Sequence, residues 1–231
     1  FSENAGLPST QALTRQLYQS LERLQTDHLD LYFMHRDNPA IPAGEFVEVL
    51  NEHLRAGRMR AFGGSNWSIA RIEEANAYAR ERGLVGFTIS SPNLALAAWN
   101  EPMWPGCVAA SDAASRAWYE RQQMPLFAWS SQASGMLTGR YKPEDRNDPA
   151  LAAIVRTWFN EGNFQRLARA QELAKRKGGT STQIGLAWVL RQPFPTFALI
   201  GPRTIEETRT SVEALNVDLT LDELRWLNLE D

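Results

Sequence analysis

The chain has 231 residues, a length that a single α/β domain commonly fills. Its 43% hydrophobic and 22% charged residues are typical of a globular protein and exclude a disordered or fibrous chain. The net charge of −3 gives no basic footprint for nucleic acid, and no apolar run approaches the roughly 18–20 residues that a membrane helix needs.

Two features bear on where the protein works and on which part of it the chain represents. Cys107 is the only cysteine, which excludes a disulfide framework and a multi-cysteine metal site, so we expect a reducing, cytoplasmic location. No signal peptide opens the chain. The first residue is Phe1 rather than Met, so we expect a chain that has been processed or that lacks its start.

The first part of the chain alternates between helical and strand patterns. Leucines recur at spacings of four, four and three within residues 11–24, which predicts an amphipathic helix. The apolar run at 29–34 stops abruptly at a polar cluster, as a buried parallel strand does. The patterns that follow predict a helix at 46–54, a strand at 58–63, a helix at 70–82 and a strand at 87–90.

The second part of the chain continues the alternation. It predicts a helix at 113–121, a strand at 125–129, helices at 164–177 and 181–190, a strand at 197–200 and two final helices. Residues 138–162 form a polar excursion that is too long for a simple connection. Three helix starts carry the spacing of a capping box, in which Thr is followed three residues later by Gln or Glu: Thr180 and Gln183, Thr204 and Glu207, Thr220 and Glu223.

Strands that are each followed by a helix predict a parallel sheet with functional loops at the carboxyl ends of its strands. On these patterns alone, two α/β architectures fit: an open doubly wound sheet and part of a (β/α)8 barrel. The G-x-G-x-x-G and P-loop signatures of nucleotide-binding open sheets are absent. We expect residues 1–231 to form a single domain.

Three histidines are present, and their positions favour different roles. His53 lies on the apolar side of its helix and is expected to be packed, while His28, in a turn, is expected to form a cap or face solvent. His35 directly follows an apolar strand, where enzymes of these folds place reacting groups. No second histidine stands at a metal-ligand spacing from it, so we expect no metal site.

Three further strand ends carry polar groups. Ser65 and Asn66 follow two glycines at the second strand end; an ordinary turn with a helix cap would give the same pattern. After the fourth strand, small polar residues and glycine at 130–135 offer backbone N–H groups to a phosphate. After the fifth, Arg203 precedes a capped helix start, which favours an anion.

In order and spacing, four segments resemble strand motifs of the aldo/keto reductase superfamily. Residues 20–36 resemble its fourth-strand signature, GRMRAFGGSN at 57–66 its fifth, residues 128–139 its seventh and IGPRT at 200–204 its eighth. The match also resembles bacterial aldo/keto reductase domains. It implies a (β/α)8 barrel of the TIM type, with about five of the eight βα units in this chain as its C-terminal portion.

The resemblance implies an oxidoreductase that reduces an aldehyde or ketone with a nicotinamide cofactor, NADP with NAD as the alternative. His35 would be the catalytic histidine that orients the substrate carbonyl. The cofactor would contact residues at the other strand ends: Ser65, Asn66, Ser91, Trp129, Ser130, Ser131, Gln132, Ser134, Gly135, Leu137, Gly201, Pro202, Arg203, Thr204, Glu207 and Ser211.

The chain also departs from the family pattern. Ser91 stands where the family commonly has a Gln that holds the carboxamide, and Glu207 and Ser211 align with a Gln and an Asn that contact adenine. A carboxylate at Glu207 could accept from the adenine amino group or repel a 2′-phosphate. The general-acid Tyr of the family, with its partner Lys and Asp, lies before the fourth strand, and that region is outside this sequence.

Three functions follow as alternatives. The first is the C-terminal part of an NAD(P)H-dependent carbonyl reductase. The second is a cofactor-binding regulatory or interaction module without turnover, and the third is a shortened barrel that closes by oligomerising. We expect a small carbonyl substrate, with no nucleic-acid or membrane partner; the sequence leaves the oligomeric state open. Trp99 and Trp104 are candidates for pocket walls.

Overall fold

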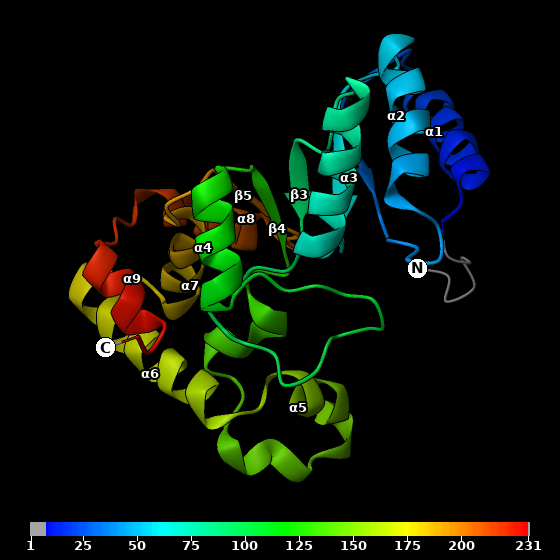
Figure 1. Cartoon of the computed structure of the whole chain (residues 1–231). Helices are drawn as coiled ribbons and strands as arrows, with labels where there is room; N and C mark the ends of the chain where they lie inside the picture. The colour runs from blue at the N-terminus through cyan, green and yellow to red at the C-terminus, as the bar shows by residue number, and fades with distance from the viewer. Residues whose placement is uncertain (1–7, 231) are drawn as a thin grey trace. The chain divides into compact units, whose positions relative to one another are not determined.

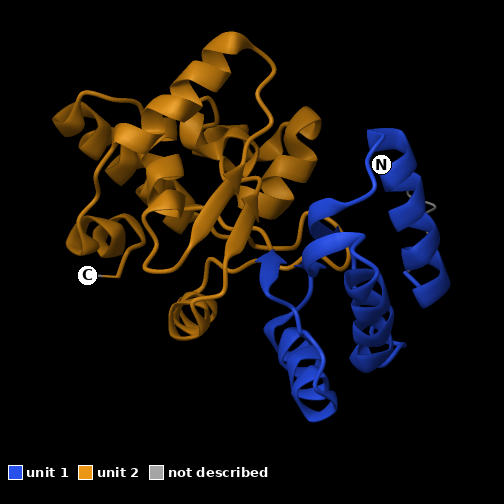
Figure 2. Ribbon diagram, turned by 90° about the horizontal axis from the view of Figure 1, so that it is seen from above, with its two compact units in different colours: residues 1–91 blue, residues 92–231 orange. Residues whose placement is uncertain are grey.

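The computed structural model describes residues 8–230 and has an α/β architecture of parallel strands and intervening helices (Figure 1). The chain divides into two compact units, residues 1–91 and 92–231, which Figure 2 shows in separate colours. Within the described part of the chain, no helix is both long enough and apolar enough to span a membrane.

Unit 1 contains a three-stranded parallel sheet with strand order β1-β2-β3. Its elements follow in chain order as α1 (Thr10–Leu24), β1 (Leu29–Met34), α2 (Ala43–Arg55), β2 (Met59–Ser65), α3 (Ile69–Arg82) and β3 (Ile89–Ser91). The β1 strand has the bounds that its apolar run predicts, but only Met34 of it is buried, so the prediction of a buried strand was wrong. The third strand begins two residues later than predicted, and Phe87, just before it, contacts the aromatic rings of Phe62 and Trp67.

The core of unit 1 lies between the sheet and its helices. Phe46 of α2 meets Trp67 edge-on with ring centroids 5.8 Å apart, and both side chains are almost fully buried. His53 of α2 is only 5% exposed, which confirms the prediction that it is packed. Its ring nitrogens contact Thr14 of α1 and Arg58, so this imidazole links two helices and a strand start.

Unit 2 holds two paired parallel strands surrounded by helices. Its strands are β4 (Leu126–Trp129) and β5 (Thr196–Leu199). Its α-helices are α4 (Ala113–Gln122), α5 (Ala152–Trp158), α6 (Glu161–Lys177), α7 (Ser181–Leu190), α8 (Ile205–Glu213) and α9 (Leu221–Leu227). Shorter 3-10 helices are η1 (Ala133–Thr138), η2 (Pro143–Asn147), η3 (Pro149–Leu151) and η4 (Ala214–Asn216).

The polar excursion expected at 138–162 is a folded substructure. It includes α5, whose Trp158 is fully buried, and the neighbouring Phe159 is 3% exposed. Both rings belong to an apolar cluster with Ala95, Ala97 and Met136. The polar residues of the segment include those of η2, none of which is buried, whereas α5 (AAIVRTW) is mostly apolar and at seven residues is too short for a helical period to show in the sequence.

The predicted capping boxes form at two helices and only in part at a third. At α7 and α9 the threonine and the side chain three residues later exchange hydrogen bonds reciprocally. At α8 the hydroxyl of Thr204 accepts from the Glu207 N–H, but the Glu207 carboxylate accepts from the N–H of Arg203. The box prediction was therefore wrong for that half of the α8 cap.

Candidate active site

The carboxyl ends of β1, β2 and β3 bring four of the predicted residues of unit 1 to one edge of its sheet. The parallel register pairs Met34 with Gly64 and Ser65 with Ser91. His35 follows β1 directly, and Asn66 follows β2. Because parallel strands align their carboxyl ends, these side chains lie at the same rim, as the strand-end argument predicts.

Two glycines let the backbone approach closely just before this rim. A Cβ atom at Gly63 would lie 1.8 Å from the carbonyl oxygen of Ile89, and one at Gly64 would lie 2.4 Å from Cδ1 of Trp67. Neither position can accept a side chain without moving β3 or the aromatic core. The pair of glycines thus sets the spacing between β2 and β3 where the polar residues begin.

Ser65 and Asn66 are buried and hydrogen-bonded to each other. The Asn66 amide donates to the Ser65 hydroxyl at 3.2 Å, and that hydroxyl donates to the Ser91 carbonyl at 2.8 Å. Asn66 adopts φ +60°, a left-handed conformation that asparagine tolerates better than most residues. The sequence S-N at this turn therefore serves both the backbone geometry and a chain of hydrogen bonds along the rim.

His35 is connected to this chain through its backbone. The Asn66 amide also donates to the His35 carbonyl, at 3.4 Å. Desolvation by burial, with a smaller effect of the neighbouring Arg36 cation, lowers the pKa of His35 below 6.5. His35 is exposed as a whole residue. The lowered pKa favours the neutral imidazole, which carries one N–H that can donate a hydrogen bond.

In unit 2, the residues after β4 form a cradle with an unusual backbone. Ser130, Ala133, Ser134 and Gly135 all have positive φ, between 48° and 87°. An anion-binding nest forms where right-handed and left-handed residues alternate or where a turn brings successive N–H groups to one side. We call residues 130–135 the cradle. Within this stretch the N–H groups of Ala133 and Gly135 donate to the carbonyls of Ser130 and Gln132 at 2.9 and 2.8 Å, so the offer of backbone N–H groups to a phosphate stays a prediction.

The cradle contains two buried polar atoms that no described protein group satisfies. The Ser131 hydroxyl and the Gln132 Oε1 atom are buried without a hydrogen-bond partner, whereas the Gln132 Nε2 atom donates to the Thr182 carbonyl at 3.0 Å. Orphaned buried polar atoms are rare and cost free energy unless a ligand or water satisfies them. The donor set of the cradle fits the phosphates and ribose of a nicotinamide dinucleotide.

Sequence reasoning missed Arg140, whose guanidinium lies against the cradle. Its Nη2 atom donates to the Ser134 carbonyl at 2.8 Å and to the Tyr141 hydroxyl at 2.6 Å. The Gly-Arg-Tyr triplet directly after the η1 turn was the available signal. Leu137, by contrast, is a fully buried core side chain against Gly185 of α7, so only its backbone could face a cofactor.

Trp129, at the end of β4, stands beside two other indole rings. Its centroid lies 5.9 Å from that of Trp99 and 6.2 Å from that of Trp104, in tilted orientations. Trp104 is 52% exposed, whereas Trp158, which contacts Trp99 edge-on, is fully buried. The rings of Trp99 and Trp104 thus lie against that of Trp129, and Trp99 also contacts the apolar cluster of α5; that they form a pocket wall stays a prediction.

The residues after β5 lead into the start of α8. Gly201, Pro202, Arg203 and Thr204 are all exposed. The Glu207 carboxylate accepts from the Arg203 N–H at 2.5 Å, so a negative charge of the chain itself occupies this helix start. Ser211, one turn further on, donates its hydroxyl hydrogen to the Glu207 carbonyl.

Within residues 8–230, no three or more His, Cys, Asp or Glu side chains gather closely enough to hold a metal ion.

These features define a class of protein. Parallel strands with intervening helices and polar residues at the strands' carboxyl ends are typical of the TIM-barrel type. The crystal structure of a thermostable aldo-keto reductase, Tm1743, solved with the inhibitor epalrestat, has this fold. It superposes on 96% of the chain with a TM-score of 0.69 at 23% identity, and the chain covers 67% of it.

The chain belongs to the aldo/keto reductase family, whose model matches residues 2–228. The uncharacterized oxidoreductase YrpG of Bacillus subtilis is 30% identical over 94% of the chain, and Protein tas of Escherichia coli is 28% identical over 96%. The chain spans 62% of the length of YrpG and 69% of that of Protein tas. These findings confirm the family resemblance and the α/β barrel-type fold that the sequence motifs predict.

Proposed function

We propose that the protein containing this chain is an NAD(P)H-dependent oxidoreductase that reduces an aldehyde or ketone to an alcohol. The observation that carries the proposal is the cradle, which combines a left-handed backbone with the orphaned buried atoms of Ser131 and Gln132. A protein retains such unsatisfied polar groups where a ligand supplies their partners. The family to which the chain belongs supports a dinucleotide as that ligand.

The residues of unit 1 would serve the reacting end of the cofactor and the substrate. Ser65, Asn66 and Ser91 would hold the carboxamide through the polar groups at the rim of β2 and β3. The neutral imidazole of His35 would donate a hydrogen bond to the carbonyl oxygen, where negative charge develops during reduction. The reduced nicotinamide supplies a hydride to the carbonyl carbon when it is bound.

The residues of unit 2 would hold the rest of the dinucleotide. Trp129 would stack on the nicotinamide ring, as the resemblance implies. The cradle, with the Leu137 backbone, would follow the pyrophosphate, and Arg140 would add a positive charge beside it. Gly201, Pro202, Arg203, Thr204, Glu207 and Ser211 would lie along the adenosine.

The alcohol product also needs a proton at its oxygen. A positioned general acid supplies such a proton most effectively when its pKa lies near the working pH. The resemblance assigns this task to a Tyr on a segment before the fourth barrel strand, outside residues 1–231. We therefore propose that residues 1–231 form the C-terminal portion of one aldo/keto reductase-like barrel domain.

The cofactor assignment is NADP, with NAD as the alternative. The exposed Arg203 guanidinium favours a 2′-phosphate, whereas the Glu207 carboxylate at the start of α8 opposes one. Titration of the protein with NADPH and NADH, followed by quenching of tryptophan fluorescence, compares the two affinities directly. We further propose a cytoplasmic location, which a single cysteine favours.

The proposed activity is tested with a protein that includes the residues encoded before Phe1. It should oxidise NADPH in the presence of small aldehydes, measured as the loss of absorbance of the reduced nicotinamide. Cofactor binding without turnover across a broad aldehyde and ketone panel would contradict the reductase and favour a cofactor-binding module. Failure to bind either cofactor would contradict both.

A further inference from the structure

The loop between β1 and α2 carries His35 and is held by the segment that follows β2. We call residues 35–42 the histidine loop. The Asn66 amide donates to the His35 carbonyl at 3.4 Å, and the indole N–H of Trp67 donates to the Arg36 carbonyl at 3.3 Å. Asn66 and Trp67, which follow β2, thus bind the consecutive backbone carbonyls of the histidine loop. The backbone of His35 is positioned from outside its own strand.

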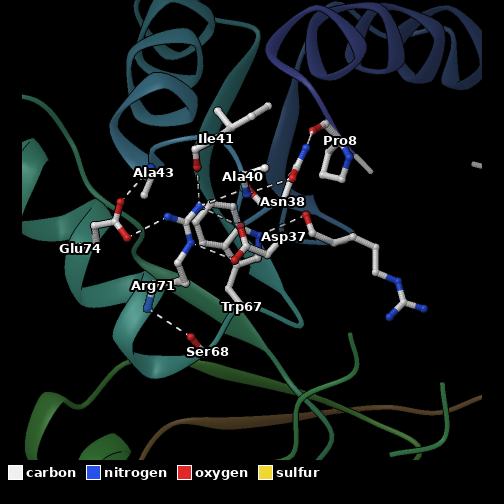
Figure 3. Close-up of polar contacts among 11 residues, drawn as sticks. Pro8, Asp37, Asn38, Ala40, Ile41, Ala43, Trp67, Ser68, Arg71 and Glu74 are labelled. Atoms are coloured by element: carbon white, nitrogen blue, oxygen red, sulfur yellow. Dashed lines mark hydrogen bonds and ion pairs between the residues drawn. The ribbon is translucent and has the colours of Figure 1, made fainter. Parts of the chain in front are cut away.

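Arg71, in the first turn of α3, binds Asp37, the next residue of the histidine loop (Figure 3). Its Nε and Nη2 atoms donate to the two carboxylate oxygens of Asp37 at 2.9 and 3.0 Å. Such a two-pronged pair fixes direction as well as distance. The side chains of Arg71 and Asp37 are only 14% and 9% exposed, so solvent screens this pair far less than a surface ion pair.

The same guanidinium also holds the far end of the histidine loop. Nη2 donates to the Ile41 carbonyl at 2.9 Å, and Nη1 donates to Glu74 at 2.8 Å. The other oxygen of Glu74 accepts from the N–H of Ala43 at 3.0 Å, at the start of α2, where Pro42 offers no side-chain cap. Glu74 therefore caps α2 from α3, and Arg71 orients Glu74.

The plane of the guanidinium is fixed as well. Its central carbon lies 5.1 Å from the ring centroid of Trp67, whose own N–H binds the histidine loop. Figure 3 shows Arg71 between Asp37 on one side and Glu74 on the other, with the Trp67 ring beside it. Hydrogen bonding to Asp37, followed by the smaller contribution of Glu74, raises the pKa of Arg71, so it stays charged.

We propose that Arg71 is a positioning residue for His35: its fork on Asp37 and its bonds to the loop carbonyls set where the imidazole lies relative to the substrate. This inference rests on the proposed function. Asp37 is two residues from His35, so releasing its carboxylate frees the loop at the point where the histidine leaves the strand. Misplacing a catalytic group by about 1 Å can cost up to about 10²-fold in rate.

The first test is a double-mutant cycle in the protein that includes the upstream residues. Arg71→Lys keeps the charge and removes the fork. It should lower kcat about 10- to 100-fold and change cofactor affinity less than about twofold. In a His35→Ala background, the same substitution should lower kcat by less than about twofold, because the group that Arg71 positions is already gone. A purely structural role predicts the same loss in both backgrounds.

Arg191→Lys is the matched control. Arg191 also binds a loop through backbone carbonyls, those of Leu215 and Val217, and through the carboxylate of Asp218. It belongs to unit 2 and has no described contact with the histidine loop. Arg191→Lys should leave kcat within about twofold of the wild type. A loss as large as that of Arg71→Lys would overturn the inference.

The second test reads the imidazole without turnover. The chain has three histidines, so their ring resonances are few enough to assign by single substitutions. Arg71→Lys should shift or broaden the His35 signals and leave those of His28 and His53 in place. Unchanged His35 signals would overturn the inference. If Arg71→Lys does not fold, Asp37→Asn, which keeps the shape and removes the charge, replaces it with the same expected outcomes.

The two tests separate this inference from the proposed function. If His35→Ala leaves turnover intact while Arg71→Lys moves the His35 resonances, the catalytic role of the histidine fails and the positioning contact stands. If His35→Ala lowers kcat about 10²-fold and Arg71→Lys lowers kcat by the same factor in both backgrounds, the catalytic role stands and the inference fails.

Discussion

His35 and Asn66 lie at adjacent strand ends, but the proposed function gives them different tasks. His35→Ala removes a hydrogen bond that strengthens in the transition state, so kcat should fall about 10²-fold. Cofactor affinity should stay within about twofold, since the proposed function assigns the dinucleotide to other residues. Stopped-flow binding and steady-state turnover of the protein with its upstream residues measure the two effects separately.

Asn66→Asp is the complementary variant. Both residues tolerate the left-handed backbone at this position, so the turn should persist while the amide donor is lost. Cofactor binding should weaken about tenfold, the effect of one or two kcal/mol from a lost buried hydrogen bond.

For His35→Ala, an unchanged kcat would show that the histidine is only a residue at a strand end and has no catalytic role.

The buried His53 gives the chain a pH-dependent stability. Arginine only donates, so the His53 Nδ1 atom accepts from Arg58 and Nε2 carries the proton toward Thr14. Burial, followed by the Arg58 cation, lowers the pKa of His53 below 6.5. The folded state therefore binds fewer protons, and the stabilisation present above pH 6.5 is lost as the pH falls through the lower, folded-state pKa.

His53→Gln should flatten this dependence. Urea unfolding at several pH values below 6.5 should show a smaller loss of stability in the variant than in the wild type. Parallel slopes for His53→Gln and the wild type would refute the assignment.

Among the elements, α7 depends most on how it begins. Its residues from Gln183 to Val189 are all buried, so its first turn determines which side chains enter the core. Thr180 and Gln183 bond reciprocally at 3.2 and 2.8 Å, and Gln183 also donates to Glu213. The capping box therefore joins α7 to the end of α8 as well as closing its own first turn.

Thr180→Ala should lower the free energy of unfolding by about 1 kcal/mol, the usual effect of losing an N-cap side chain. Thr208→Ala is the matched control, since its exposed hydroxyl only bonds back to the helix carbonyl of Thr204. It should change stability by less than about 0.5 kcal/mol. Urea denaturation measures the free energy of unfolding of both variants. Equal losses would mean that the capping box of α7 does not stabilise the protein more than an exposed hydroxyl within a helix does.

At the scale of the whole chain, each unit has an apolar strand at an end of its own sheet: β1 in unit 1 and β5, paired with β4, in unit 2. Leu199 and Phe197 of β5 are each 50% exposed, and Leu31 of β1 is 41% exposed. Apolar end strands with unpaired backbone groups pair readily with other chains. We therefore expect the 231-residue chain to associate with itself as its concentration rises.

Leu199→Lys should reduce this association, because a lysine on an edge strand opposes pairing. Leu24→Lys, at the exposed end of α1 and away from any strand, makes the same chemical change and should have little effect. Light scattering over a concentration series distinguishes the two variants. Equal behaviour of both would point to general solubility rather than to the edge of the sheet.

The sequence by itself determined the local elements and the order of the strand-end motifs. The bounds of β1 and α7 match their predictions because a continuous apolar run and a capping box are local signals, read within a few residues. His35, Ser65, Asn66 and Ser91 were placed at one rim for a similar reason. Parallel strands align their carboxyl ends, so knowing where each strand stops is sufficient.

Only the tertiary structure decided the features that depend on distant partners. The α5 helix packs through Trp158, with the neighbouring Phe159, against residues near 95–97, about sixty positions away, and its seven residues are too few for a helical period to show in the sequence. Arg71 reaches Asp37 across 34 positions, and neither residue stands out in a local pattern. A sequence pattern reports which face of an element is buried, whereas the direction of a guanidinium or a buried hydroxyl is set by the elements packed against it.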